Sequence, residues 1–263
     1  MGSVYAVANQ KGGVGKTTTA INLGACMAAS GAQTLIVDLD PQCNATIALG
    51  ADRDASPSSY DCLNGEVSVA EAARPAGPDN LWLVPASREL AGASVELPRI
   101  EHSETRLRER LGPLRERFAF TLLDCPPSLG PVTVNALAAA DRVIVPVQAE
   151  YLALEGLVQF LDTLALVRRA VNPSLELSGL IITMHDERTR LSIDVERDLR
   201  DHFGELVFET AIPRSIKLAE SPSYGEPVIA HAPTSRGSEA YMALAREIAA
   251  REARDSEPQE EAA

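Results

Sequence analysis

Residues 9–18 read Asn-Gln-Lys-Gly-Gly-Val-Gly-Lys-Thr-Thr, a glycine-rich stretch that contains Gly-Lys-Thr near its end. This ending is typical of a phosphate-binding loop, in which the lysine reaches the β- and γ-phosphates of a nucleotide and the next hydroxyl ligates Mg²⁺. Gly12, Gly13 and Gly15 permit backbone conformations that turn N–H groups toward phosphate oxygens. The residues that we expect to bind nucleotide here are Lys11, Gly12, Gly13, Val14, Gly15, Lys16, Thr17 and Thr18.

The sequence on either side supplies the secondary structure that such a loop requires. Residues 3–8 form a short, mostly apolar run that predicts a buried strand, and residues 18–29 predict a helix. The positive N-terminal end of that helix adds to the attraction for phosphate. Because strand, loop and helix all occur together, a glycine-rich turn with an incidental lysine is disfavoured. Lys11 stands where the ordinary pattern has its first glycine, and it could simply be a solvated charge.

Two aspartates follow the next predicted strand. Residues 34–37 are mostly β-branched and apolar, and they lead into Asp-Leu-Asp-Pro-Gln-Cys-Asn-Ala-Thr over residues 38–46. The carboxyl end of a strand is where open α/β sheets bind ligands. Because side chains two apart on an extended segment point the same way, we expect Asp38 to support Mg²⁺ while Asp40 faces the γ-phosphate and its attacking water. The alternative is that the two acids only cap the following helix.

A further predicted strand also ends in an aspartate. Residues 118–124 read Phe-Ala-Phe-Thr-Leu-Leu-Asp, and Cys-Pro-Pro-Ser follows. An apolar strand that ends in aspartate is the Walker B pattern, so we expect Asp124 to hold the Mg²⁺ shell through water or the Thr17 hydroxyl. The two prolines fix a turn that can sense the γ-phosphate. This pattern has weak specificity alone, but in register with the other two motifs it is a strong indication.

The combined motifs resemble the ParA/MinD family of ATPases. The family's deviant Walker A loop reads Lys-Gly-Gly-x-Gly-Lys-Thr, and the resemblance implies that Lys11 crosses a dimer interface to the partner's phosphates. The family's switch reads Asp-x-Asp-Pro-Gln-Gly-Asn-Ala-Thr, so Cys43 replaces the usual glycine, with an expected effect on local flexibility or rate. The implied catalytic residues are Lys11, Lys16 and Asp40, and the implied metal-binding residues are Thr17, Asp38 and Asp124.

Two segments in the C-terminal third resemble the short Soj members of this family. They span residues 183–191 and 212–228, and in relatives their starts flank the adenine, which implies nucleotide contacts for Met184 and Pro213. Their basic residues are implied to help form a DNA-binding surface on the dimer. The candidates for DNA binding are Arg188, Arg190, Arg214, Lys217 and Arg236.

The charge balance of the chain opposes simple DNA binding. There are 24 Lys and Arg against 37 Asp and Glu, a net charge of −13. Non-specific binding must therefore come from a local basic patch, which dimerisation would double. The alternative is that the arginines make ordinary surface ion pairs. Arg190 could take either role. Relatives commonly have asparagine at this position, so Arg190 is either an extra phosphate contact or an ion-pair partner for Asp194, which follows four residues later on a predicted helix.

The whole chain is expected to form one α/β domain, a P-loop NTPase fold with a mostly parallel, twisted sheet flanked by helices on both faces. With 263 residues and 45% apolar content, it can bury one large core. The predicted strands span residues 3–8, 34–37, 81–84, 118–124, 142–147 and 177–183. The predicted helices span residues 18–29, 87–97, 104–111, 132–139, 153–171, 192–202 and 238–251. Residues 51–59 and 74–80 are predicted loops, residues 1–252 the ATPase domain, and residues 253–263 a disordered acidic tail.

Several classes of protein are disfavoured by composition. The sequence has no run of about 18 apolar residues and no signal peptide. Cys26, Cys43, Cys62 and Cys125 show no Cys-x-x-Cys spacing, so no metal or Fe–S site is indicated and a cytoplasmic location is expected. The acidic C-terminal residues differ from the amphipathic membrane helix of MinD relatives, so membrane binding is disfavoured.

The motifs and the resemblance together predict a ParA/Soj-type ATPase that needs ATP and Mg²⁺. The implied cycle is an ATP-dependent homodimer that binds double-stranded DNA non-specifically, associates with the nucleoid, and is released by slow hydrolysis. A ParB-type partner is implied to stimulate that hydrolysis, and the process is chromosome or plasmid partitioning. Three alternatives remain open: a ParA-like ATPase that positions a protein cargo, a MinD-like regulator of division, and a metabolic P-loop enzyme that transfers phosphate.

Overall fold

Seven strands form one mostly parallel sheet in the computed structural model, which describes residues 1–150 and 153–256. Their order across the sheet is β3-β4-β2-β5-β1-β6-β7, and β3 pairs antiparallel with β4 at one edge. The strands are β1 Ser3–Val7, β2 Thr34–Asp38, β3 Arg74–Pro75, β4 Leu81–Val84, β5 Phe120–Asp124, β6 Arg142–Gln148 and β7 Glu176–Thr183.

The central strands are buried on both faces of the sheet, which explains their continuous apolar sequences. All five residues of β2 are buried, as are the last four of β1 and of β5. β5 lies between β2 and β1, and its register places Asp124 beside Asp38 on β2 and beside Val7 on β1. Two aspartates from separate strands therefore lie side by side at the carboxyl edge, next to the loop that follows β1.

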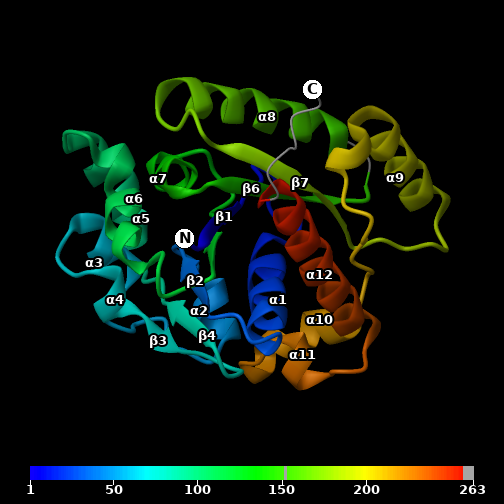
Figure 1. Ribbon diagram of the computed structural model, residues 1–263, viewed down its shortest axis with the longest axis horizontal. Helices are drawn as coiled ribbons and strands as arrows, with labels where there is room; N and C mark the ends of the chain where they lie inside the picture. The colour runs from blue at the N-terminus through cyan, green and yellow to red at the C-terminus, as the bar shows by residue number, and fades with distance from the viewer. Residues whose placement is uncertain (151–152, 257–263) are drawn as a thin grey trace, which may run out of the picture.

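Helices cover both faces of the sheet (Figure 1). They are α1 Lys16–Ala29, α2 Asn44–Ala48, α3 Ser59–Asn64, α4 Val69–Ala72, α5 Leu90–Glu96, α6 Arg106–Leu111, α7 Pro131–Ala139, α8 Ala153–Ala170, α9 Arg190–Phe203, α10 Ile216–Glu220, α11 Val228–His231 and α12 Arg236–Ser256. α1, α2, α11 and α12 share one apolar core, and α3 to α8 share another. Among the helices in the described part of the chain, none is long and apolar enough to cross a membrane.

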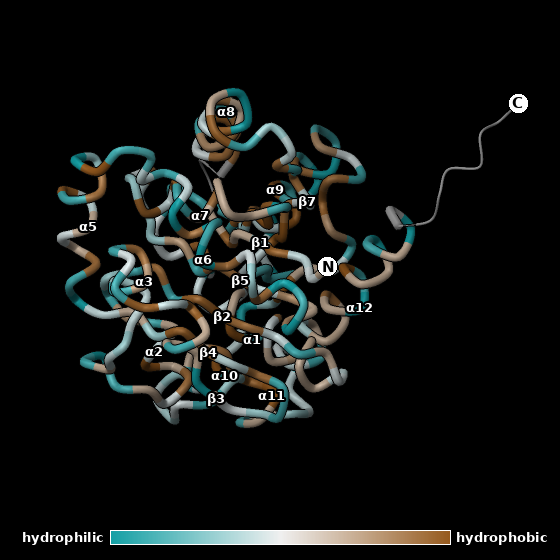
Figure 2. The backbone as a smooth tube through the Cα atoms, turned by 60° about the vertical axis from the view of Figure 1, so that its left-hand side comes forward, coloured by the Kyte–Doolittle hydropathy of each residue, from teal (hydrophilic) through white to brown (hydrophobic). Residues whose placement is uncertain are grey.

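The two apolar cores lie on opposite faces of the sheet and hold the layers together. Ile36 and Leu122 face α1 and α12, whereas Leu35 and Leu123 face the helices of the other layer. Figure 2 shows apolar segments gathered along the strands and the inner helices. α1 approaches the sheet closely at Gly24, where an added Cβ would lie 3.0 Å from the Ile36 side chain. This helix carries the end of the glycine-rich loop, so the close approach fixes the loop against the sheet.

Most of the predicted strands and helices are confirmed, with boundaries that differ by a few residues. The loop predicted for residues 74–80 is wrong at its start, because Arg74 and Pro75 form β3. Helices α2, α3, α4, α10 and α11 were not predicted, since they have only four to six residues and show little periodicity. α12 continues to Ser256, so the first four residues of the predicted disordered tail are helical. Residues 257–263 lie outside the described residues.

Candidate nucleotide site and neighbouring basic surface

The loop between β1 and α1 is anchored on both sides. Gly15 immediately precedes α1 and has φ 89°, a left-handed conformation that favours glycine. The Thr183 hydroxyl at the end of β7 donates a 2.8 Å hydrogen bond to the carbonyl of Val14. At the start of the loop, the Asn9 side chain accepts a 3.0 Å hydrogen bond from the N–H of Lys11. These contacts hold the loop in a shape that can wrap a phosphate chain.

The two lysines of the loop have different surroundings. Lys16 is 6% exposed, and its ammonium donates a 3.0 Å hydrogen bond to the carbonyl of Lys11. Burial lowers the pKa of Lys16, an effect that Asp124 and Asp40 partly offset. The side chain of Lys11 makes no hydrogen bond or ion pair with the residues that the structure describes. Lys16 can therefore serve a phosphate of its own subunit, whereas Lys11 is available to a different partner.

Asp38 is fully buried, and its carboxylate is already engaged. Its Oδ2 accepts hydrogen bonds from the N–H and the hydroxyl of Thr46, at 2.8 and 2.7 Å, and its Oδ1 accepts one from the N–H of Asp40 at 3.1 Å. The Thr46 hydroxyl also accepts a 2.8 Å hydrogen bond from the N–H of Ala86, just beyond β4. Through Thr46, hydrogen bonds therefore connect Asp38 at the end of β2 to α2 and to the residue Ala86 beyond β4. Most of its acceptor capacity is used here, which limits what it can offer to Mg²⁺.

Asp124 is also fully buried, but its carboxylate is not engaged in this way. Neither oxygen has a hydrogen-bond partner among the described residues. Burial and the neighbouring Asp38 carboxylate raise the pKa of Asp124 well above its usual range, while the nearby Thr17 hydroxyl and Lys16 ammonium lower it in part. Burial likewise raises the pKa of Asp38 to about 6, although the bonds from Thr46 oppose that rise. A cation placed beside Asp124 would remove the cost of burying this bare carboxylate.

The residues at this edge of the sheet fit Mg²⁺ that is bound mainly through a nucleotide. In proteins Mg²⁺ keeps several waters and takes few protein ligands. Within residues 1–150 and 153–256, no three His, Cys, Asp or Glu side chains gather into a metal cage. The Thr17 hydroxyl and Asp124, directly or through water, are the groups that could hold such an ion beside two phosphates.

Asp40 is oriented by the turn that follows β2. It is 6% exposed, and its Oδ1 accepts a 2.9 Å hydrogen bond from the N–H of Gln42. The N–H of Cys43 donates a 2.9 Å hydrogen bond to the carbonyl of Asp40 and so closes the turn. The φ of Cys43 is 57°, a left-handed conformation that explains why glycine is usual at this position. The Cys43 thiol is buried and donates to the carbonyl of Pro41. The departure from glycine therefore fills the turn with a buried side chain.

A pocket of about 220 Å³ lies beside the loop, between the end of β7 and the segment before α10. Met184 and Pro213 both line it, so the structure brings these two predicted base-flanking residues together. Tyr241 of α12 lines it as well, and its hydroxyl lies 3.2 Å from the Thr19 hydroxyl on α1. Tyr241 was not predicted from the sequence, because an aromatic residue at helical spacing is more often part of a core. Among the described residues that line the pocket none is acidic, and several are apolar, which suits the flat face of a purine base.

The five basic candidates for DNA binding are exposed, and each is paired with an acidic side chain. The pairs and their N–O distances are Arg188–Asp186 at 2.8 Å, Arg190–Asp194 at 3.7 Å, Arg214–Glu150 at 3.6 Å, Lys217–Glu220 at 2.8 Å and Arg236–Glu187 at 3.9 Å. The five basic side chains are between 51% and 95% exposed. Exposed ion pairs contribute little to stability, so these cations can exchange their partners readily.

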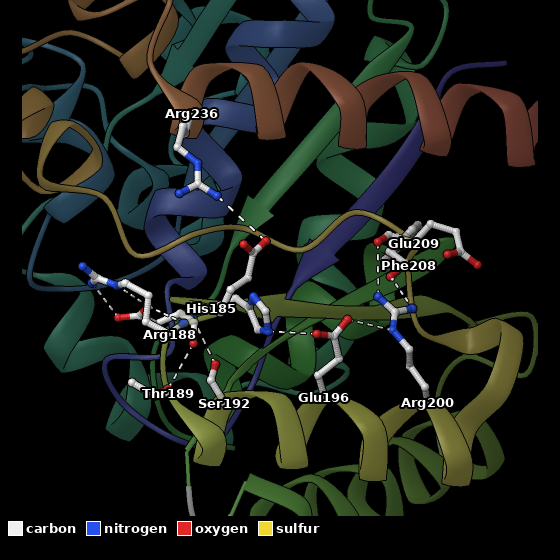
Figure 3. Close-up of polar contacts among 11 residues, drawn as sticks. His185, Arg188, Thr189, Ser192, Glu196, Arg200, Phe208, Glu209 and Arg236 are labelled. Atoms are coloured by element: carbon white, nitrogen blue, oxygen red, sulfur yellow. Dashed lines mark hydrogen bonds and ion pairs between the residues drawn. The ribbon is translucent and has the colours of Figure 1, made fainter.

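Three of the five cations gather around the short segment that precedes α9. The Arg188 guanidinium donates hydrogen bonds to both carboxylate oxygens of Asp186, at 2.8 Å each (Figure 3). These bonds hold the pKa of Asp186 well below its usual range, and the nearby Arg214 adds to the effect. Arg236 reaches Glu187 from the start of α12. The other two cations pair along their own helices, α9 and α10.

Comparison with known proteins identifies the family. Chromosome-partitioning ATPase Soj of Thermus thermophilus is 53% identical over 246 residues, which cover 94% of this chain and 95% of that protein. Chromosome partitioning protein ParA of Caulobacter vibrioides is 46% identical over 252 residues, with 95% and 94% covered. The chain belongs to the ParA/Soj family of partitioning ATPases. The family profile described as an AAA domain also matches residues 2–177.

A solved structure shares the fold of this ParA/Soj-family chain. It is described as cobyrinic acid a,c-diamide synthase from Mycobacterium smegmatis with a bound ATP analogue and magnesium. It is 39% identical, the superposition has a TM-score of 0.84, and 97% of each chain is covered. The ParA/Soj fold and the P-loop ATPase class predicted from the sequence are therefore confirmed.

Proposed function

We propose that this chain is a switch that dimerises with Mg·ATP, binds double-stranded DNA non-specifically in that state, and drives the partitioning of a chromosome or plasmid. The observation that carries the proposal is the convergence of Lys16, Asp40 and Asp124 at the carboxyl ends of neighbouring strands. The ATP analogue and magnesium in a neighbour that is 39% identical support these two ligands. The names of the curated relatives support the process.

The site residues divide the work of hydrolysis among them. Bound Mg²⁺ supplies charge neutralisation at the β- and γ-phosphates. Thr17 and Asp124 hold its shell, while Lys16 moves its hydrogen bond from the loop carbonyl to a phosphate oxygen. Asp40 orients the attacking water. Lys11 of a second subunit adds positive charge at the γ-phosphate, and a charge supplied in this way raises the rate by roughly 10³-fold or more.

The basic surface supports DNA binding by the dimer rather than by one subunit. With a net charge of −13, attraction to DNA must be local. Arg188, Arg214 and Arg236 gather around the segment that precedes α9, and they can contact backbone phosphates once they exchange their acidic partners for them. Each exchange gives a modest gain, so the doubling of contacts in a dimer decides whether DNA is bound. A ParB-type partner that stimulates hydrolysis would release the dimer and complete the cycle on the nucleoid.

An amide-forming activity of the kind named for the M. smegmatis neighbour finds less support. Amide formation through a cysteine nucleophile would need an accessible thiolate. Cys26, Cys43, Cys62 and Cys125 are all buried. Burial raises the pKa of Cys43 to about 11 and the pKa of Cys26 and Cys62 to about 12, so these thiols are held in their unreactive form.

The proposal is tested by DNA binding of the purified chain with ATP, with ADP and without nucleotide, at two salt concentrations. We expect binding that requires ATP and weakens with salt, and that is lost in Lys16→Ala and in the double variant Arg214→Ala with Lys217→Ala. A wild-type chain that forms a dimer with ATP but ignores DNA would refute the DNA step, and would favour a protein cargo instead.

A further inference from the structure

Met184 has an unusual backbone conformation at the edge of the base pocket. Its φ of 52° lies in the left-handed region, which is unfavourable for a residue with a side chain. Such a conformation persists only where the surrounding contacts impose it. On one side of Met184, the Thr183 hydroxyl is bonded to the phosphate-binding loop. On the other side stands His185, whose contacts must supply the remaining constraint.

His185 joins the two residues that flank the pocket. Its N–H donates a 2.9 Å hydrogen bond to the carbonyl of Ile212, and its carbonyl accepts a 2.9 Å hydrogen bond from the N–H of Arg214. Pro213 is thus held between these two bonds, in a parallel bridge with His185. The backbone of His185 therefore sets the distance between Met184 and Pro213.

Glu196 on α9 contacts both His185 and Arg200, and Arg200 in turn contacts the segment that leads to Pro213 (Figure 3). Its Oε2 lies 2.8 Å from Nε2 of His185, an ion-pair distance without hydrogen-bond geometry. Its Oε1 accepts a 2.9 Å hydrogen bond from Arg200. The Arg200 guanidinium donates in turn to the carbonyls of Phe208 and Glu209, at 3.3 and 3.2 Å. These carbonyls belong to the segment that leads to Pro213, which forms one wall of the pocket, and Met184 beside His185 forms the other. The Glu196 carboxylate therefore connects the two walls.

From these contacts we infer that Glu196 and His185 are positioning residues that set the spacing of the base pocket and thereby favour adenine over guanine. The inference rests on the proposed function, because it takes ATP as the ligand. Neither side chain lines the pocket, so both act through Met184 and Pro213. The His185 side chain is 9% exposed and Glu196 is 26% exposed, so their interaction is only partly weakened by water.

The effect falls on the base rather than on the phosphates. The phosphate-binding loop is held by hydrogen bonds of Asn9 and Thr183 with its own backbone, and in the described part of the chain neither residue hydrogen-bonds to Glu196 or to His185. Guanine differs from adenine in the donors and acceptors on its edge, and a carboxylate could accept hydrogen bonds from its N–H groups. The described residues that line the pocket include no carboxylate, so discrimination is left to the spacing and the backbone groups of Met184 and Pro213. Loosening of those walls should weaken ATP binding and leave GTP binding little changed.

The test compares Glu196→Gln with Asp198→Asn, which removes the same charge from an exposed position on the same helix. Dissociation constants for ATP and GTP are measured by calorimetry on the full chain, together with KM and kcat for ATP hydrolysis. For Glu196→Gln we expect a rise of about fivefold in Kd and KM for ATP, with kcat and the Kd for GTP unchanged. Asp198→Asn should match the wild type throughout.

His185→Phe provides an independent check, since it keeps an aromatic ring in the same space. It should reproduce the loss of ATP preference, and the double variant should lose no more than either single variant, because both changes break one chain of contacts. Equal weakening of ATP and GTP, or an unchanged preference in both variants, would overturn the positioning role. A wild-type chain that binds neither nucleotide would instead refute the proposed function itself.

Discussion

Asp38 and Asp124 show how two neighbouring aspartates can take different roles. Both are fully buried at the carboxyl edge of the sheet, side by side on β2 and β5. Asp38 accepts three hydrogen bonds, whereas Asp124 accepts none from the described residues. Burial raises the pKa of both carboxyls, but only Asp124 is left with its acceptor capacity free. Asp124 is therefore suited to a cation, and Asp38 to holding the switch segment in place.

Thr46 is the residue on which the position of Asp38 depends. Its hydroxyl joins Asp38 to the N–H of Ala86, so Thr46→Val would leave a buried N–H without its partner and remove one bond from a buried carboxylate. We expect the free energy of unfolding to fall by roughly 1–3 kcal/mol. Thr46→Ser keeps the hydroxyl and should lose at most about 1 kcal/mol. Urea denaturation of both variants checks this, and equal stability of the two would contradict it.

The positions of the residues that we propose to bind nucleotide could be predicted from the sequence, because these residues lie in contiguous motifs. Lys16, Thr17 and Asp124 are where the motifs place them. The bonds from Thr46 to Asp38 could not be predicted, since they depend on the turn between residues eight apart. The place of Tyr241 in the pocket could not be predicted either, because it depends on how α12 packs against α1.

At the scale of elements, the position of α1 depends on its close contact with the sheet. A Cβ on Gly24 would lie 3.0 Å from Ile36 and 3.1 Å from Leu122. We expect Gly24→Val to destabilise the protein by roughly 1–3 kcal/mol through overpacking. Gly156→Val on α8 is the matched control, because a Cβ at Gly156 meets no described atom within 4 Å outside the backbone of its own helix. If chemical denaturation shows equal losses for the two variants, close packing of α1 is not what sets its position.

Glu247 attaches α12 to the segment that leads into the base pocket. It accepts hydrogen bonds from the N–H groups of Glu209 and Thr210, at 2.8 and 3.0 Å, and pairs with Arg251 at 2.9 Å. Burial alone would raise the pKa of Glu247, but these bonds outweigh it and the net shift is downward. Its stabilising effect is therefore complete above the pKa of a free glutamate, about 4.3, and is lost as pH falls through the lower folded pKa.

Glu247→Gln should accordingly destabilise the protein by about 1–2 kcal/mol at neutral pH, because glutamine keeps only a neutral acceptor. The difference from the wild type should shrink once the pH falls below about 4. Thermal or urea denaturation across this pH range measures it. A difference that stays constant with pH would show that the charge of Glu247 contributes nothing.

The regular elements could largely be predicted from their apolar patterns, whereas the short ones could not. The buried strands read as continuous apolar runs, and β4 was predicted with both of its boundaries. α3 and α4 depend on capping by Ser58 and Ser68, which is visible in the sequence only as a weak local signal. β3 contains only Arg74 and Pro75, and its pairing with β4 is a tertiary contact that has no periodicity of its own.

At the scale of the whole molecule, the proposed DNA surface belongs to an acidic protein and carries its own acidic partners. The chain has a net charge of −13, and each of the five basic candidates is paired within the subunit. Only the Arg190–Asp194 pair was foreseen, because it follows helical spacing. The Arg214–Glu150 and Arg236–Glu187 pairs depend on tertiary structure, whereas Arg188–Asp186 and Lys217–Glu220 are local pairs that were not foreseen. Local pairing of this kind would keep a single subunit off DNA and make binding depend on assembly.

Neutralising those partners should strengthen DNA binding in the ATP state. In the double variant Asp186→Asn with Glu187→Gln, Arg188 and Arg236 lose their partners and become free for phosphates. The slope of log affinity against log salt should steepen by about 1–2. Asp198→Asn with Glu205→Gln removes the same charge from other exposed positions and serves as the control. Equal gains in both double variants would show a general charge effect without a defined surface.

The most direct test of the nucleotide switch is the mass of the protein with Mg²⁺ and a non-hydrolysable ATP analogue, measured by sedimentation for the wild type and Lys11→Ala. The Lys11 side chain has no partner in the described part of its own subunit, so it is expected to act on the phosphates of another. We expect the wild type to double its mass of 28.1 kDa, while Lys11→Ala binds the analogue and stays monomeric. A wild type that remains monomeric, or a Lys11→Ala variant that dimerises equally well, would contradict it.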